Sequence, residues 1–299
     1  MSASPTFDDV LAAARRLEGV ALRTPLLENT RVNARLGGRL FIKAECLQRT
    51  GSFKLRGAYN FLASMSEADR KKGVVGWSSG NHAQGLAEAA RLMGMKATIV
   101  MPADAPALKI ANTRASGAEV VLHDRVKDSR EEIGMGIAKK TGATVVPPYD
   151  HPWILTGQGT AGLEIVEQAK ALGVTLDAVA APCSGGGLST GIALAVKGLS
   201  PNTSVHAGEP AGFDTSRARL PAAPSRRTTS SRARSATPCW RRHRATSPFR
   251  SPRSCSARDL SSPMTRCSMP WRRRSESSSW WSSRAARWRW RQRSPASCR

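Results

Sequence analysis

Three short loops in the sequence carry residues whose types could support chemistry on a bound small molecule. The first, LQRTGSFKLRGA at 47–58, places Lys54 shortly after a tight TG turn. A lysine amine that the backbone holds in place can attack a carbonyl carbon and form a Schiff base. The other two are SSGNHAQG at 78–85 and SGGGL at 184–188, both rich in small and hydrogen-bonding residues. We predict that the three loops form one site.

The second loop precedes a predicted helix and suits a carboxylate. Its backbone N–H groups and serine hydroxyls can converge at the positive end of the helix, and Asn81 can donate to a phenolate-like oxygen. The alternative is an ordinary serine or asparagine helix cap. His82 could act as a base, although a histidine in the first helical turn more often has a structural role.

The third loop suits a single phosphate. Successive glycines allow backbone N–H groups to surround an anion at a helix N-terminus, and the alternative is a flexible turn. The run matches neither GxGxxG nor a Walker sequence, and it is not followed by an acidic ribose-binding residue, so we do not expect it to bind a dinucleotide.

The elements around the loops alternate between short apolar strands and amphipathic helices, which predicts a parallel α/β architecture. All three loops fall between a strand and a helix, where open parallel sheets bind ligands. The predicted helices are Phe7–Leu17, Ser52–Met65, His82–Met93, Leu108–Ser116, Ser129–Thr141, Thr160–Leu172 and Leu188–Leu199. The predicted strands are Arg39–Ala44, Val74–Trp77, Ala97–Met101, Glu119–Leu122, Thr144–Val146, Ala178–Ala181 and Val205–Gly208.

A lysine for an imine, a pocket for a carboxylate and a cradle for one phosphate together indicate pyridoxal phosphate with an amino-acid substrate. The three motifs, with GQGT at 157–160, resemble the serine/threonine dehydratase group of fold-type II pyridoxal-phosphate enzymes, which includes serine racemases. The resemblance runs from about Thr24 to about Asp214. It implies an α/β fold like that of the tryptophan synthase β chain, with the cofactor between two parallel-sheet domains. The large domain, which is incomplete, would comprise 1–50 and 148–216, and the small domain 51–147.

The resemblance also implies roles for individual residues. Lys54 would hold the cofactor and then act as the base at Cα, while Asn81 would contact the ring hydroxyl. Ser79 could deliver a proton to the opposite face of Cα, and Glu209 resembles a residue that binds a divalent cation in some relatives. The substrate carboxylate would be held by Ser78, Ser79, Gly80, Asn81 and His82, and the phosphate by Gly185, Gly186, Gly187 and Leu188.

The predicted reaction is dehydration and deamination of L-threonine or L-serine to a 2-oxo acid and ammonia. Serine racemisation is the alternative within the same fold, since Ser79 occupies a position where many pure threonine dehydratases have alanine. The sequence does not separate threonine, serine and 3-hydroxyaspartate as substrates. It departs from the family at Ser184, where a fourth glycine is usual, and at Thr215, where a second acid is usual.

Composition divides the chain at about residue 216. The net charge is +24, but 22 of the 46 basic residues and only two of the 22 acidic residues follow Ser216. Residues 217–299 form an aberrant tail rich in Arg, Ser and Trp, with six of the eight tryptophans and no periodicity. This composition is typical of a GC-rich gene read out of frame. We predict that the reading frame is lost near Asp214–Leu220, that the tail is irregular, and that the product is unstable or inactive.

Other features restrict partners and compartment. The chain has no apolar run long enough for a membrane span and no signal-peptide pattern, and its six scattered cysteines indicate reduced thiols. We therefore expect a cytoplasmic protein without a membrane partner, and a homodimer by resemblance. A protein without catalytic activity, whose basic tail grips single-stranded nucleic acid, is the alternative of another class, but we do not expect nucleic acid to bind.

Overall fold

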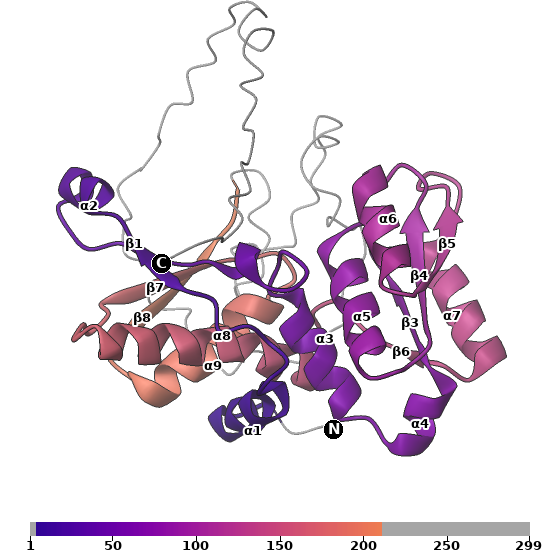
Figure 1. Ribbon diagram of the computed structural model, residues 1–299, viewed down its shortest axis with the longest axis horizontal. Helices are drawn as coiled ribbons and strands as arrows, with labels where there is room; N and C mark the ends of the chain where they lie inside the picture. The colour runs from indigo at the N-terminus through magenta and orange to yellow at the C-terminus, as the bar shows by residue number, and fades with distance from the viewer. Residues whose placement is uncertain (1–3, 211–299) are drawn as a thin grey trace, which may run out of the picture. The chain divides into compact units, whose positions relative to one another are not determined.

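The computed structural model describes residues 4–210, which all belong to one compact unit (Figure 1). The predicted frameshift, the irregular tail and Thr215 lie outside the described residues. Among residues 4–210, no helix has both the length and the apolar composition needed to cross a membrane.

The first half of the described chain contains α1 Phe7–Leu17, β1 Leu26–Glu28, α2 Thr30–Leu36, β2 Phe41–Lys43, the 3-10 turn η1 Glu45–Leu47, α3 Lys54–Ala63, α4 Glu67–Lys72, β3 Val74–Trp77 and α5 Asn81–Leu92. The second half contains β4 Ala97–Pro102, α6 Ala107–Ala115, β5 Glu119–His123, α7 Arg130–Thr141, β6 Thr144–Val145, α8 Pro152–Ala171, β7 Ala178–Pro182, α9 Gly187–Leu199 and β8 Ser204–Gly208.

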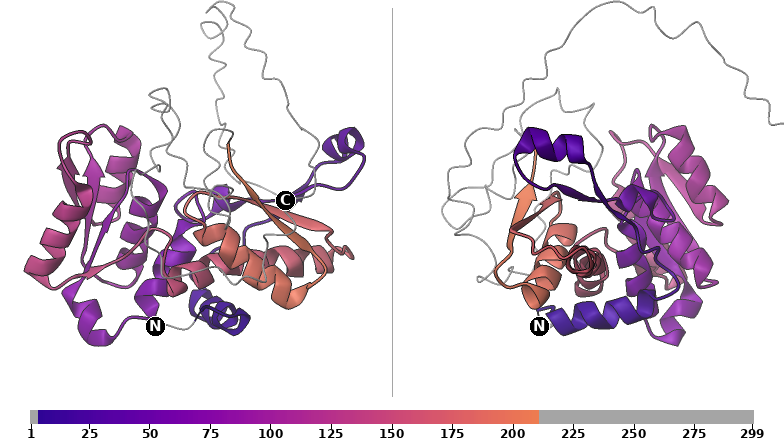
Figure 2. Two further views of the ribbon diagram at one scale, coloured as in Figure 1. Left: turned by 180° about the vertical axis from the view of Figure 1, so that it is seen from behind. Right: turned by 60° about the vertical axis from the view of Figure 1, so that its left-hand side comes forward.

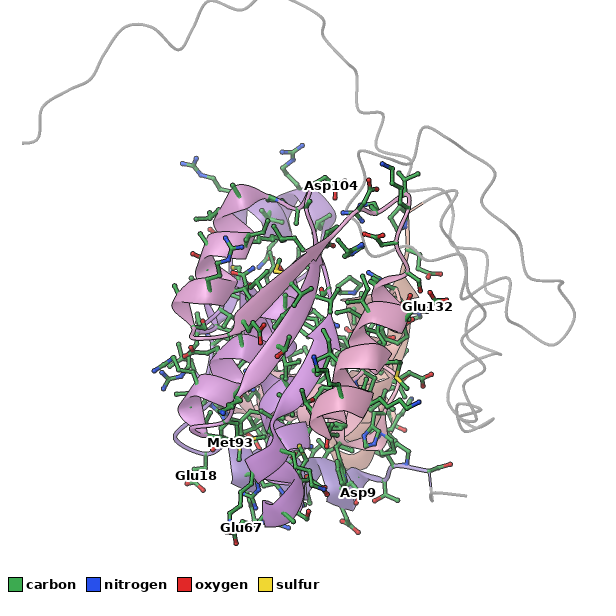
Figure 3. All side chains as sticks on the ribbon, turned by 90° about the vertical axis from the view of Figure 1, so that its right-hand side faces the viewer. Asp9, Glu18, Glu67, Met93, Asp104 and Glu132 are labelled. Atoms are coloured by element: carbon green, nitrogen blue, oxygen red, sulfur yellow. The ribbon has the colours of Figure 1, made fainter. Side chains whose placement is uncertain are left out.

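A four-stranded parallel sheet in the order β5-β4-β3-β6 forms the centre of residues 67–145. Helices α5 and α6 cover one face and α7 the other, so β3 and β4 are buried on both sides, as their near-continuous apolar runs predict (Figures 1 and 2). In Figure 3, Asp104, which follows β4, lies at one end of this sheet, and Met93, which precedes β4, lies at the other. The SSGN loop follows β3 and therefore lies at the same end as Asp104.

Two further sheets have two strands each. Strands β7 and β8 are parallel and bury Val179 and Ala181 against α8 and α9, while the alternate residues of β7 are exposed. Strands β1 and β2 form an antiparallel ribbon, in which Leu26 pairs with Lys43. This ribbon differs from the all-parallel expectation, because three-residue strands carry too little sequence pattern to show their direction.

Helix α3, which begins at Lys54, packs against α5 on one side and α8 on the other. The contact with α8 is close enough to require glycine: a Cβ at Gly157 would lie 2.6 Å from the Arg56 carbonyl oxygen. On its other faces α8 meets α9, where a Cβ at Gly159 would lie 2.8 Å from the Gly191 carbonyl oxygen. The GQGT motif therefore lies inside a helix and serves helix packing.

A buried cluster of charged side chains also stabilises the contact between α3 and α8. Arg56, which is 1% exposed, donates to both carboxylate oxygens of Glu45 at 2.8 Å and to those of Glu164 at 2.6 and 3.0 Å. Lys43 also pairs with Glu164. Burial works against the positive charge of Arg56, but the hydrogen bonds from the two glutamates raise its pKa above the ordinary value. Arg56 therefore stays charged, and its positive charge stabilises the carboxylates of Glu45 and Glu164.

Most predicted elements are present with ends shifted by one or two residues, and Phe7–Leu17 and Val74–Trp77 match the prediction fully. The largest error is α8, which begins at Pro152 and not at the predicted Thr160. The prediction also lacked β1, α2, η1 and α4.

Candidate active site

Lys54 is the first residue of α3, and its Nζ donates to the Pro148 carbonyl oxygen at 2.6 Å. Gly51, at φ 69°, forms the turn that precedes it. Ser52, at which the sequence predicts the helix to begin, does not cap it: the N-cap is Phe53, and the buried Ser52 hydroxyl has no hydrogen-bond partner within the described residues. Packing against neighbouring elements, and not a side-chain cap, fixes the start of α3.

The SSGNHAQG motif lies against Lys54 because its last glycine contacts the lysine backbone. A Cβ at Gly85 would lie 2.9 Å from the Lys54 carbonyl carbon and 3.0 Å from its Cβ. This close approach joins α5 to the first turn of α3. It brings the first and second loops together, as the sequence predicts.

His82, from the same motif, lies near Lys54, and its imidazole stays neutral. It is 4% exposed, and one ring nitrogen lies 3.3 Å from the Val146 carbonyl oxygen. Burial, followed by the nearby charge of Lys54, lowers the pKa of His82 to about 3, against the opposing effect of that hydrogen bond. The imidazole therefore supports the β3–β6 region, and its place in the predicted carboxylate set remains a prediction.

The glycine loop meets Lys54 through the segment Pro148–Tyr149. The carbonyl of Pro148 accepts from Lys54, and the next residue, Tyr149, lies on the glycines: a Cβ at Gly185 would be 2.2 Å from the Tyr149 ring, and one at Gly187 would be 2.9 Å from the Tyr149 carbonyl oxygen. The consecutive residues Pro148 and Tyr149 therefore lie between the Lys54 amine and the glycine loop. The amine and the loop do not lie on separate surfaces of the molecule.

The three helices that begin at the motifs, α3, α5 and α9, have no side-chain cap, and α6 has none either. Helix α5 begins after Gly80, and α9 begins after Gly186, whose φ is 86°. In contrast α1, α2, α4, α7 and α8 are each capped by a side-chain hydrogen bond. The first-turn N–H groups of α5 and α9 can therefore bind an anion. Serine capping, the alternative considered for the second loop, does not occur at α5.

The remaining predicted residues fall close to these loops. Ser78 and Ser79 are buried before α5, and the Ser78 hydroxyl accepts from the Gly80 N–H at 3.2 Å. Leu188 lies in the first turn of α9. Glu209 follows β8, beside the glycine loop, because the Cys183 N–H donates to the Gly208 carbonyl oxygen at 2.9 Å.

The divalent cation proposed at Glu209 remains a prediction. Residues 4–210 contain no group of three or more His, Cys, Asp or Glu side chains that could hold a metal ion. Residues 211–214, which follow Glu209 and Pro210, lie outside the described residues.

Sequence reasoning missed one residue beside the second loop. Lys109 of α6 has its Nζ 3.3 Å from the Asn81 Oδ1 and 3.0 Å from the position of a Cβ at Gly80. No local sequence signal marks it, because 28 residues separate the two partners and only the packing of α6 on α5 brings them together.

The family model described as "Pyridoxal-phosphate dependent enzyme" matches residues 17–247. The chain belongs to the pyridoxal-phosphate dependent enzyme family. It is 52% identical over 210 residues to an L-threo-3-hydroxyaspartate ammonia-lyase of a Pseudomonas species, covering 70% of this chain and 65% of the relative. It is 45% identical over 211 residues to the serine racemase of Schizosaccharomyces pombe, covering 70% of this chain and 64% of the relative.

Solved structures agree with these relatives. Maize serine racemase superposes with a TM-score of 0.68 at 38% identity, covering 72% of this chain and 64% of that one. The processed form of threonine deaminase isoform 2 from Solanum lycopersicum superposes with a TM-score of 0.65 at 40% identity, covering 70% and 56%. The α/β fold of this enzyme group is therefore present, although the chain spans just under two thirds of the length of the curated relatives named above.

The residues present fit pyridoxal phosphate. The cofactor needs an amine for its aldehyde, N–H groups for its phosphate and a donor for its ring hydroxyl, and Lys54, the glycine loop and Asn81 can supply these. The glycine loop fits a phosphate because it precedes the uncapped first turn of α9, and a side chain at Gly185 or Gly187 would collide with Tyr149.

We expect Gly185→Ala to weaken capture of pyridoxal phosphate about 10-fold or more, because over-packing typically costs ~1–3 kcal/mol. The added methyl must displace the Tyr149 ring and, with it, the Pro148 carbonyl that accepts the hydrogen bond from Lys54 Nζ. Gly136→Ala on α7 is the control, since a Cβ there meets nothing within 4 Å. Absorbance titration with the cofactor measures both variants. Equal capture by wild type and Gly185→Ala would show that the cradle is not used.

Proposed function

We propose that the site dehydrates and deaminates small 3-hydroxy amino acids, with L-threonine, L-serine and L-threo-3-hydroxyaspartate as the candidate substrates. The observation that carries the proposal is the juxtaposition of the Lys54 amine, through Pro148 and Tyr149, with the glycine cradle. The names of the relatives, which include ammonia-lyases for threonine and 3-hydroxyaspartate, support the same reaction class.

When bound, pyridoxal phosphate supplies an electron sink for the pair of electrons left at Cα. Lys54 removes the Cα proton, and its position on a helix start that is buttressed by Gly85 keeps the amine aligned. The N–H groups before α5 orient the substrate carboxylate. The β-hydroxyl leaves as water, and hydrolysis of the resulting enamine consumes one water and gives a 2-oxo acid and ammonia.

Serine racemisation is the second candidate, and the observation that favours it is the placement of Ser79. This serine is 3% exposed and directly precedes Gly80, the N-cap of α5. A hydroxyl there could return a proton to the face of Cα opposite Lys54. The racemase names among the relatives support this alternative.

One assay separates the candidates. The purified chain is loaded with pyridoxal phosphate and incubated with each of the three substrates, and 2-oxo acid, ammonia and D-serine are quantified. Formation of 2-oxo acid with equal ammonia supports the lyase, whereas D-serine without 2-oxo acid supports the racemase. If a lysine-bound cofactor forms but neither product does, the proposed activity is wrong for this polypeptide, and the expectation of an inactive product holds.

Several expectations from the sequence remain predictions. They are the domain boundaries, the cytoplasmic location, the homodimer, the lack of nucleic-acid binding and the shift in reading frame. The last is checked by resequencing codons 210–299, where an intact frame would end the idea.

A further inference from the structure

Lys109 lies where it can determine the orientation of the Asn81 side chain. Its Nζ is 3.3 Å from Asn81 Oδ1, and one helical turn farther along, Asn112 Nδ2 donates to Gln84 Oε1 at 3.3 Å. The two pairs link α6 to α5 with the same three-residue spacing on each helix. The position of the ammonium is therefore set by the packing of two helices.

The chemistry of the pair leaves a single arrangement. A lysine ammonium has three donors and no acceptor, whereas an asparagine amide has an acceptor oxygen on one side and two N–H donors on the other. The amide oxygen must face Lys109, and the NH₂ group must face away from it. An oxygen that accepts from a charged donor also makes the amide a stronger donor at its other end.

The amide of Asn81 is open to a ligand. Ser78, Ser79, Gly80 and His82 are buried, but Asn81 is exposed at the first position of α5. Within residues 4–210, the only hydrogen bond of its side chain is the one from Lys109. Across the same residues Lys109 forms no salt bridge, so its charge is directed at this loop.

We propose that Lys109 is a positioning residue: it holds Asn81 so that Nδ2 donates to the ring hydroxyl oxygen of pyridoxal phosphate. The proposal rests on the proposed function, since it needs the cofactor to bind at Lys54. Removing Lys109 frees the amide to rotate, so that its oxygen can turn toward the electron-rich hydroxyl and the hydrogen bond from Nδ2 is lost.

The test is a double-mutant cycle read out by binding of pyridoxal phosphate, with no substrate present. We expect Lys109→Met to raise the dissociation constant about 10-fold, the effect of losing a hydrogen bond to a charged group. In an Asn81→Ala background the same substitution should change nothing further. Lys109→Arg should restore binding, because arginine is also a pure donor.

Lys71→Met is the control, because Lys71 is an exposed cation whose side chain is 75% accessible and pairs only with Glu67 among the described residues. Equal affinities for wild type and Lys109→Met would overturn the inference, as would a 10-fold loss that persists in the Asn81→Ala background. Failure of the wild-type chain to form a lysine-bound cofactor would instead refute the proposed function, so the two failures are distinguishable. Thermal unfolding of the cofactor-free variants checks that folding is unchanged.

Discussion

Lys54→Ala abolishes the visible absorbance of lysine-bound pyridoxal phosphate and lowers 2-oxo acid formation by about 10²–10⁴-fold or more, the usual contribution of a positioned base. This is the expected result because the Schiff base requires an amine at this position, and the same amine removes the Cα proton. The measurement is an absorbance spectrum after removal of free cofactor, followed by the product assay.

A second variant separates chemistry from structure. Lys54→Arg keeps a donor that can reach the Pro148 carbonyl and keeps the charge beside His82, but it forms no stable imine. We expect Lys54→Arg to fold like wild type and to lose the absorbance band as fully as Lys54→Ala does. If the band persists in either variant, another lysine carries the cofactor and the site is wrongly assigned.

Arg56→Met is expected to lower the free energy of unfolding by about 3–5 kcal/mol, the usual cost of removing one partner from a buried ion pair. The side chain of Arg56 is 1% accessible, and those of Glu45 and Glu164 are 14% and 13% accessible. Without the guanidinium the two carboxylates lose their shared counter-charge, and α3 loses part of its attachment to α8. Urea unfolding followed by circular dichroism measures the change.

Arg23→Met is the matched control for this experiment. Arg23 donates to Glu167 at 2.9 Å, but both side chains are at least half accessible. An exposed pair of this kind typically contributes only ~0–1 kcal/mol. If the two arginine variants lose equal stability, the buried cluster does not hold α3 to α8, and the alignment of Lys54 would depend on the glycine contacts alone.

Prediction from sequence worked where the local pattern and the tertiary environment agreed. The apolar run Val74–Trp77 and the helix after it are visible from composition, because both faces of β3 are covered and most residues of α5 are buried. The glycine loop and the lysine motif were also visible, since the chemistry needs particular residue types at fixed spacing.

Prediction from sequence failed where a glycine can have either of two structural roles. The predicted helix begins at Thr160, just after Gly157 and Gly159, yet α8 runs through both glycines. A glycine that lets one helix touch another cannot be told from a glycine that ends a helix until the neighbour is known. The same limit applies to Ser52, a good cap by type, whose hydroxyl lies buried beside a helix that begins without it.

The sequence by itself determined the chemistry: a lysine for a carbonyl, a loop for a carboxylate and glycines for a phosphate, each a local string of residues. Only the tertiary structure decided their mutual placement. Contacts between residues far apart in the chain, such as Lys54 with Pro148, Tyr149 with Gly185 and Lys109 with Asn81, carry no periodic signal. They arise because close packing of α3, α5, α6 and α8 leaves room for only one arrangement of these side chains.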